Sequence, residues 1–302
     1  PSFIQVLQAA ADAYRNRKDK ILETSSHLVD ALARASTGSA SGNVGEETQE
    51  RAYRALSNQY DAVHGGFGRA PKFPQPVTLE FLMRYHVQTG DPSALEMALH
   101  TLGQMATGGI RDHLAGGFHR YSVDSRWLVP HFEKMLYDNA LLTRVYLQAH
   151  QITGADGHRS IVEDTLDYLL ADMRTTEGAF SSARDADSEG EEGLFYLWTL
   201  EEVREVLQPD EASLFSRAYD VAAGGNFEGK SILNLPHNLE AISRAEGIPA
   251  DKLAMTLAKA RSKLLEVRNR REPPFRDDKV IVSWNAMAIR ALAEAGAGLG
   301  RW

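Results

Sequence analysis

Apolar residues recur along this chain at the three- and four-residue spacing that marks one face of a helix. Clear examples are the stretches Leu95, Ala98, Leu99, Leu102 and Met105, then Ile161, Thr165, Leu166, Leu169 and Met173, and later Leu253, Leu257, Ala260 and Leu264. Because the same period returns along most of the sequence, the pattern predicts an all-α fold.

The connections between these helices alternate between short and long. Short turns at residues 89–92 and 153–156 each contain a glycine, which favours the conformation that ends a helix, and so predict antiparallel hairpins. Four longer segments are rich in Gly, Pro and aromatic residues: 61–75, 108–130, 175–198 and 271–283. If short and long connections alternate, all the long loops lie at one end of the helices, where we expect function.

A short motif repeats in the long segments. Gly65-Gly66-Phe67, Gly116-Gly117-Phe118 and Gly178-Ala179-Phe180 each open a turn, and their spacing is that of one helical hairpin plus its loop. Trp284-Asn285-Ala286 also echoes Tyr137-Asp138-Asn139-Ala140, which predicts equivalent positions in a ring. The repeats favour an (α/α) toroid of helical hairpins, an incomplete (α/α)6 barrel, over a plain bundle.

Three regions are predicted along the chain. Residues 1–35 read as one long helix, residues 36–46 are rich in Ser, Gly and Ala and read as a flexible linker, and residues 47–302 hold the partial toroid. We expect the chain to be truncated at both ends, because it starts with Pro1 inside a helical pattern and stops just after another helix. An open ring edge would then favour self-association.

The composition narrows the classes of partner. With 302 residues, 43% hydrophobic and 25% charged, the chain has the material for a large core. A net charge of −8 disfavours nucleic acid and anionic membrane surfaces as partners. The sequence has no cysteine and no apolar run long enough to span a bilayer, and its first residues lack a signal-peptide pattern. We expect a cytoplasmic protein without a cofactor or metal.

Residues 224–231, GGNFEGKS, match the phosphate-binding P-loop pattern letter for letter. That pattern binds nucleotide only where a buried strand enters the loop and a helix leaves it. Here residues 211–221 predict a helix before the loop, and residues 232–236 are extended and end in proline. The match is therefore predicted to be coincidental.

The segment 185–196 resembles the opening of a calcium-binding loop. Its acidic residues fit the first ligand positions, but Tyr196 stands where a bidentate glutamate is needed. Ion pairs that line a pocket or brace the loop are the favoured interpretation.

Ionisable and aromatic residues are concentrated in two stretches, 112–138 and 184–198, which we expect to meet at the mouth of a cavity. Sugar sites need this mixture, because aromatic rings stack on pyranose faces while carboxylates, Arg and His bind hydroxyl groups and move protons. A helix starting near Pro130 would place His131, Lys134 and Asp138 on one stripe facing the pocket. The candidate catalytic residues are His119, His131, Glu133, Asp138, Asp185 and Asp187. The candidate binding residues are Arg120, Tyr121, Trp127, Tyr137, Arg184, Tyr196, Trp198, Trp284 and Asn285.

Several long motifs carry a family resemblance. They are GGFGRAPKFPQP (65–76), the run at 108–140, SARDADSEGEEGLFYLWT (182–199), NFEGKSIL (226–233) and DDKVIVSWNAMAI (277–289). Together they resemble the spermatogenesis-associated protein 20 family. The resemblance implies a toroid similar to N-acylglucosamine 2-epimerases and six-hairpin glycosidases, preceded in the family by a thioredoxin-like domain that residues 1–35 would join. The family's reaction is not established, so the resemblance leaves activity open.

Three functional hypotheses follow for the two stretches. A 2-epimerase-like site would use His131 and His119 as acid and base, with Arg120 or Arg184 polarising a sugar carbonyl. A hydrolase-like site would pair Glu133 or Asp138 with Asp185 or Asp187. A non-catalytic module would instead bind or position a partner for the thioredoxin-like domain, and its polar residues would cap helices and brace loops.

Overall fold

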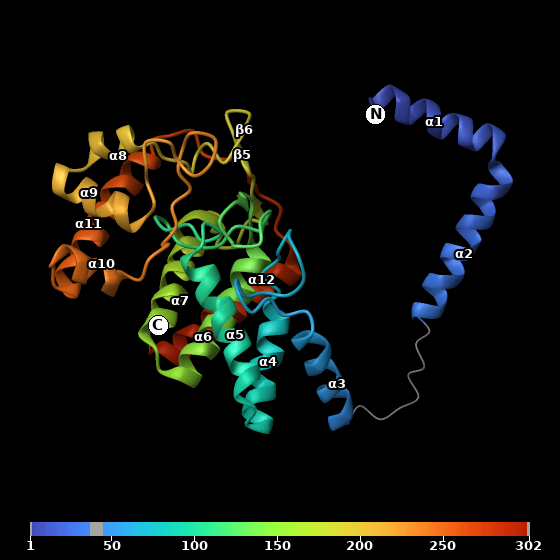
Figure 1. The fold of residues 1–302 in the computed structure, drawn as a ribbon, viewed down its shortest axis with the longest axis horizontal. Coiled ribbons are helices and arrows are strands. Elements are labelled where there is room, and N and C mark those ends of the chain that lie inside the picture. The colour runs from blue at the N-terminus through green and yellow to red at the C-terminus, as the bar shows by residue number, and fades with distance from the viewer. Residues whose placement is uncertain (1, 37–44, 301–302) are drawn as a thin grey trace. The chain divides into compact units, whose positions relative to one another are not determined.

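The computed structural model describes residues 2–36 and 45–300 (Figure 1). Contacts within the chain divide it into two compact units, residues 1–50 and 51–302.

The first unit contains two helices, α1 (Phe3–Asn16) and α2 (Lys18–Ser36). The single helix predicted here is wrong, because Arg17 leaves the helical conformation at φ −136° and ψ 31°. Ser2 and Gln5 form a capping box that fixes the start of α1. Most of the predicted linker, residues 37–44, lies outside the described residues.

The second unit is built from antiparallel helix pairs. It opens with α3 (Glu46–Ser57), which crosses the boundary between the units, and continues with α4 (Pro76–Thr89), α5 (Pro92–Thr107), α6 (Leu136–Thr153), α7 (Asp156–Tyr168) with a π-helical extension (Leu169–Met173), and α12 (Val282–Leu299). The predicted turns are confirmed: Gly90 and Gly154 end α4 and α6 in the left-handed conformation, and the Asp91 side chain caps α5.

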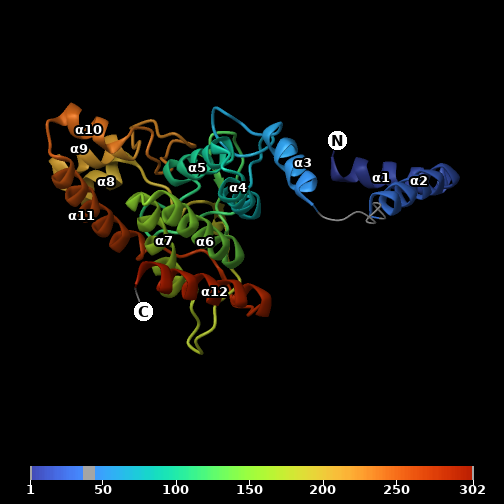
Figure 2. The ribbon, with the colours of Figure 1, turned by 90° about the horizontal axis from the view of Figure 1, so that it is seen from below.

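The helices form two layers. The helices that follow a long loop lie side by side, with α6 packed between α4 and α12, while α5 pairs with α4 and α7 pairs with α6 (Figure 2). This arrangement is that of part of an α/α toroid, and the predicted all-α class is confirmed. The core between the layers contains Leu79, Leu82, Leu102, Leu142, Val145 and Tyr146.

Four further helices are inserted between α7 and α12. They are α8 (Leu200–Val206), α9 (Pro209–Ala218), α10 (Leu239–Glu246) and α11 (Ala250–Arg268), and they share a core of their own that includes Val203, Phe215, Ile242, Leu253 and Leu264. The P-loop match at 224–231 lies in the turns between α9 and α10 and is followed by extended chain, as predicted. No helix receives it, so the context for phosphate binding is absent there.

The long loops meet at one end of the helices, as predicted. Short strands β3 (Lys134–Met135), β4 (Ala183–Arg184) and β7 (Arg276–Asp277) form a three-stranded antiparallel sheet that joins three of the loops. A bridge between Lys72 and Ser122 ties the first loop to the second. Two smaller pairs complete the region: β1 (Tyr121–Ser122) with β2 (Pro130–His131), and β5 (Asp187–Ser188) with β6 (Glu191–Glu192).

The first two loops contain the same buried brace. In one, the ammonium group of Lys72 donates to Asp61 Oδ2 at 2.6 Å and to the Gly65 carbonyl at 2.7 Å. In the other, Lys134 donates to Asp112 Oδ2 at 2.7 Å and to the Gly116 carbonyl at 2.9 Å. Both lysines are 1% exposed. The repeated Gly-Gly-Phe motif is thus the end of a turn held by one lysine and one aspartate.

A second device repeats at the starts of α6 and α12. The Asn139 amide accepts from the backbone N–H of Phe118 and donates to its carbonyl, at 2.7 and 3.0 Å. Asn285 does the same with Phe180, at 2.8 and 2.9 Å. The predicted equivalence of the two helix starts is confirmed, and in both the shared residue is an asparagine that clamps the preceding loop.

Candidate functional site

Polar side chains from the second long loop gather at the amino-terminal end of α6. The pairing of β1 with β2 places Tyr121 opposite His131, and Arg120 and Glu133 flank this pair. We call Arg120, His131, Glu133, Tyr137 and Asp138 the acid–base cluster. Its members come from the loop and from the first turn of α6, so the fold of the loop decides their geometry.

Glu133 is the centre of the cluster. Arg120 Nη1 donates to its Oε2 atom at 2.7 Å, and His131 Nε2 lies 3.1 Å from the same oxygen. The other ring nitrogen of His131, Nδ1, lies 2.7 Å from Oε1 of Glu192, which comes from β6. The imidazole is therefore held between two carboxylates at 26% exposure, and its contact with Glu192 joins the stretches 112–138 and 184–198.

Asp138 is the buried carboxyl group of the cluster. The residue is 7% exposed, and its Oδ2 atom has no hydrogen-bond partner among the described residues. Burial raises the pKa of Asp138 to about 7; Arg120 and Tyr137 oppose the rise, and the Glu133 carboxylate adds to it. Asp138 can therefore hold a proton near neutral pH beside a carboxylate that is paired with an arginine.

Aromatic rings surround the cluster. Tyr121 stacks on His131 with ring centres 5.0 Å apart, and Phe73 from the first loop stacks on Tyr121 at 4.8 Å. Trp284 meets Tyr137 edge to face at 4.8 Å. Phe73 is 46% exposed, yet the sequence did not identify it as a site residue, because its loop lies far from the cluster in the chain.

His119 does not join the cluster. Its side chain is 2% exposed, and Nδ1 lies 2.9 Å from the Phe132 carbonyl. Burial, helped by the charge of Lys134, lowers the pKa of His119 to about 3, so the ring stays neutral. The expectation that it shares proton transfer with His131 is wrong.

Three further expected binding residues serve the packing of the fold. Trp127 and Trp198 are 0% exposed, so neither offers a ring to a ligand. Trp127 donates its indole N–H to the His64 carbonyl. The guanidinium group of Arg271 lies over the ring of Trp198, 4.1 Å from the ring centre. Asn285 is the loop clamp described above. These three residues stabilise the fold, because their buried side chains cannot line the mouth of a cavity.

Asp185 and Asp187 also lie outside the cluster. Both are exposed; Asp185 accepts a hydrogen bond from the Ala186 backbone, and Asp187 stands opposite Glu192 in the β5–β6 pair. The acidic segment is thus a short hairpin. Among the described residues, no group of three or more His, Cys, Asp or Glu side chains is placed to hold a metal ion.

The predicted stripe of His131, Lys134 and Asp138 on one helix is wrong, because α6 begins only at Leu136. Residues 130–131 and 134–135 pair in the short strands β2 and β3, on either side of Phe132 and Glu133, so neighbouring side chains point to opposite sides. Glu133 faces the cluster, whereas Lys134 is buried on the other side. This reversal separates two sets of charges that the sequence places next to each other.

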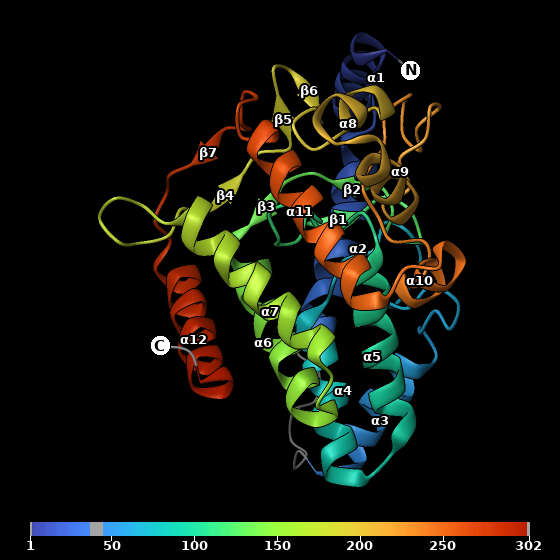
Figure 3. The ribbon, with the colours of Figure 1, turned by 90° about the vertical axis from the view of Figure 1, so that its left-hand side faces the viewer.

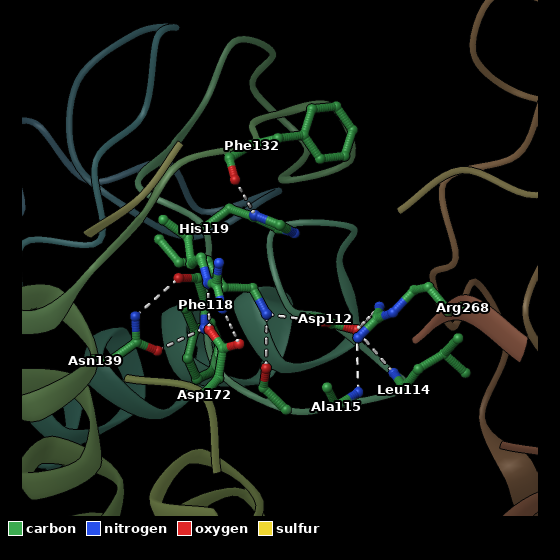
Figure 4. Close-up of polar contacts among 12 residues, drawn as sticks. Asp112, Leu114, Ala115, Phe118, His119, Phe132, Asn139, Asp172 and Arg268 are labelled. Carbon is green, nitrogen blue, oxygen red and sulfur yellow. Dashed lines mark hydrogen bonds and ion pairs between the residues drawn. The ribbon is translucent and has the colours of Figure 1, made fainter. Parts of the chain in front are cut away.

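Lys134, Arg184 and Tyr196 border a separate cavity of about 580 Å³ between α7 and α11. Asp112 and Arg268 lie at its wall, where Arg268 reaches Asp112 (Figure 4). Arg184 makes two hydrogen bonds to Asp172, at 2.8 and 2.7 Å. Arg184 and Tyr196 were expected to share one cavity mouth with His131. Residues from both stretches, 112–138 and 184–198, line this cavity, but His131 is not one of them.

Comparison with known proteins shows similarity over nearly the whole chain. The chain is 35% identical to spermatogenesis-associated protein 20 of Homo sapiens and 36% identical to that of Rattus norvegicus, in each case over 99% of its length. A Caenorhabditis elegans protein is 30% identical over 97% of the chain. The chain spans 42% of the length of the two mammalian relatives. No family model matches the sequence.

Solved structures give weaker similarity. A sugar epimerase from a ruminal bacterium has a TM-score of 0.41 at 14% identity, with 82% of this chain and 79% of that chain covered. A family 76 mannosidase from Bacteroides thetaiotaomicron has a TM-score of 0.43 at 11% identity, covering 88% and 67%. At this level the similarity adds nothing to the assignment of a reaction. Within the described residues, no helix is long and apolar enough to cross a membrane.

Proposed function

We propose that the acid–base cluster acts on a carbohydrate and that its reaction is hydrolase-like. The observation that supports this is the pair of carboxyl groups with opposite roles: Asp138 holds a proton near neutral pH, while Glu133 is bound by Arg120 as a carboxylate. Neighbouring carboxyl groups in different environments, one buried and one bound by an arginine, are typical of glycosidase acid–base pairs.

In this reaction Asp138 would donate its proton to the glycosidic oxygen as the bond to the anomeric carbon breaks. Glu133 would stabilise the positive charge that develops on that carbon or accept a proton from the attacking water. Arg120 holds Glu133 in place, and the exposed ring of Phe73, which stacks on Tyr121, offers a stacking surface for a sugar. The reaction breaks the glycosidic bond of the substrate and consumes one water molecule.

The epimerase-like alternative has weaker support in its two-histidine form. His119 is buried and neutral, and Arg184, one candidate for polarising a carbonyl, is bound to Asp172. His131 with Arg120 is what remains of that proposal. The carboxyl pair therefore favours hydrolysis over proton exchange at carbon.

We also propose that the chain belongs to the family of spermatogenesis-associated protein 20, because identity of 35% extends over 99% of its residues. A non-catalytic role beside a thioredoxin-like domain is the competing proposal. The braces made by Lys72 and Lys134 support it in part, since they show that buried charges in these loops do hold structure.

The test is hydrolysis of a panel of aryl glycosides and unlabelled oligosaccharides, measured as the release of reducing sugar. We expect Asp138→Asn and Glu133→Gln each to lower turnover by at least about a hundredfold. Asp187→Asn is the matched control, because it removes an exposed charge in the facing loop. If no sugar is bound or turned over by the folded protein, the non-catalytic proposal replaces this one.

A further inference from the structure

The cavity between α7 and α11 is separate from the acid–base cluster. Figure 3 shows α11 running beside α7, and both helices line the cavity along one face. Lys134 borders it, whereas its neighbour Glu133 belongs to the cluster on the other side of the extended segment. A volume of about 580 Å³ is within the range of small-molecule sites.

The wall of this cavity holds a buried set of three charges. Asp112 accepts from Lys134 at 2.7 Å and from Arg268 at 2.8 Å. The three residues are 5%, 1% and 3% exposed. One carboxylate therefore faces two cations, and the set keeps a net charge of +1 in a region shielded from water. The other carboxylates that border the cavity do not cancel it, because Asp172 pairs with Arg184, Asp164 pairs with Arg111, and Asp167 is exposed to water.

The first loop provides an internal reference for this charge. There the equivalent brace is Lys72 with Asp61, one cation to one carboxylate, and it is neutral. The turn therefore folds without a second cation. The extra positive charge in the second loop comes from Arg268, at the end of the inserted helix α11. Arg268 shares its carboxylate with Lys134, and a buried net charge is costly, so a net charge of +1 at a cavity points to a ligand of opposite sign.

Two more groups at this wall lack partners. Nε of Arg268 and the hydroxyl group of Tyr168 are buried and have no hydrogen-bond partner among the described residues. Arg261 lies two turns before Arg268 on the same face of α11, is half-buried and also lines the cavity. Leu265 and Pro274 add apolar surface to the wall.

We propose that this cavity is a second binding site, which takes a small anion of about monosaccharide size carrying a carboxylate or a phosphate. The anion balances the charge that Arg268 brings to Asp112 and Lys134. Arg261 binds its charged group from the open side, and the apolar wall accepts the carbon skeleton. The site is independent of the reaction at the acid–base cluster.

The test is isothermal titration calorimetry of the 302-residue chain with glucuronate, glucose 6-phosphate and glucose. We expect at least one of the two anions to bind and the neutral sugar not to bind. The anion that binds identifies the charged group as carboxylate or phosphate. Arg261→Ala should weaken binding roughly tenfold, the loss of one hydrogen bond to a charged group.

Lys259→Ala is the matched control, because it removes one exposed cation from the same helix outside the cavity, and it should bind like the wild type. Tyr168→Phe is a second variant that is expected to fold, since it removes a hydroxyl group with no partner. It should keep or raise the thermal midpoint and weaken the anion several-fold. Absence of heat with both anions up to about 10 mM, equal binding of glucose, or equal affinity of the Arg261→Ala and Lys259→Ala variants would overturn the proposal.

Discussion

At the scale of single residues, Asp138 shows how burial sets chemistry. The carboxyl group sits in the first turn of α6, where an ionised side chain would gain from the helix dipole, yet it is 7% exposed and its pKa is raised to about 7. Loss of water outweighs the favourable charges around it. The residue thus keeps a proton that it would lose in solvent, which is the property that a general acid needs.

This shift has a consequence for stability. The folded-state pKa of Asp138 is about 7 and its ordinary value is 3.8, so the folded protein binds the proton more tightly. The stabilisation that this proton gives the folded state is complete below pH 4. It is lost as the pH rises through 7, and the loss amounts to up to about 4 kcal/mol. We therefore compare the free energy of unfolding of Asp138→Asn with that of the wild type. Between pH 4 and pH 8 we expect this difference to shift in favour of the variant.

Urea unfolding at the two pH values measures this difference, and Asp187→Asn serves as the exposed control. An Asp138→Asn variant whose stability follows the wild type at both pH values would mean that this carboxyl group is ionised in the folded state.

At the scale of secondary-structure elements, the loops are held by repeated pairs. Asp61 and Asp112 each accept from a lysine and from two backbone N–H groups of their own turn. Although burial acts to raise it, the pKa of Asp61 is held at about 2 by Lys72 and these N–H groups. Burial acts to raise the pKa of Asp112 as well, but the charges and hydrogen bonds of Arg268 and Lys134 hold it well below its usual range.

We expect Asp112→Asn to destabilise the protein more than Asp61→Asn at pH 7. Loss of the Asp112 charge leaves two buried cations without a partner, at a cost of about 3 to 5 kcal/mol. Asp61 is 23% exposed, so water can compensate in part and the cost falls to about 1 to 2 kcal/mol. Chemical denaturation of the two variants gives the comparison, and equal losses would contradict the different roles of the two braces.

The helices and loops show how much of the fold the sequence could predict. Helical periodicity, glycine turns and alternating loop lengths were enough for the hairpins and for the meeting of the loops. The brace by Lys134 was missed because extended pairing in β2 and β3 overrides the helical spacing of residues 131–138. His119 and Trp127 look like site residues in the sequence, since burial depends on contacts with distant segments that no local pattern records.

At the scale of the whole second unit, the inserted helices α8–α11 form a cluster with its own core beside the layers of α4–α7. Periodicity alone predicted α11 as a helix but could not show that it lies outside the ring. Arg268 ties this insertion to the second loop through Asp112, 156 residues away in the chain. The cavity lies at this junction, so its shape depends on how firmly the insertion is held.

We expect the insertion to open as a cooperative unit separate from the helical layers. Hydrogen exchange followed by mass spectrometry should show α8–α11 exchanging together and faster than α6, and Arg268→Met should accelerate the insertion without changing α4 and α6. Uniform exchange across the second unit, in the wild type and the variant, would show that the two cores unfold as one.

The most direct test of the acid–base assignment is the protonation of Asp138 itself. Carbon-13 NMR of the aspartate carboxyl groups, with the resonance assigned by its loss in Asp138→Asn, gives the titration midpoint. The account predicts a midpoint near 7, which moves lower in Glu133→Gln because the neighbouring negative charge is removed. A midpoint near the ordinary value of 3.8, unchanged by Glu133→Gln, would contradict it.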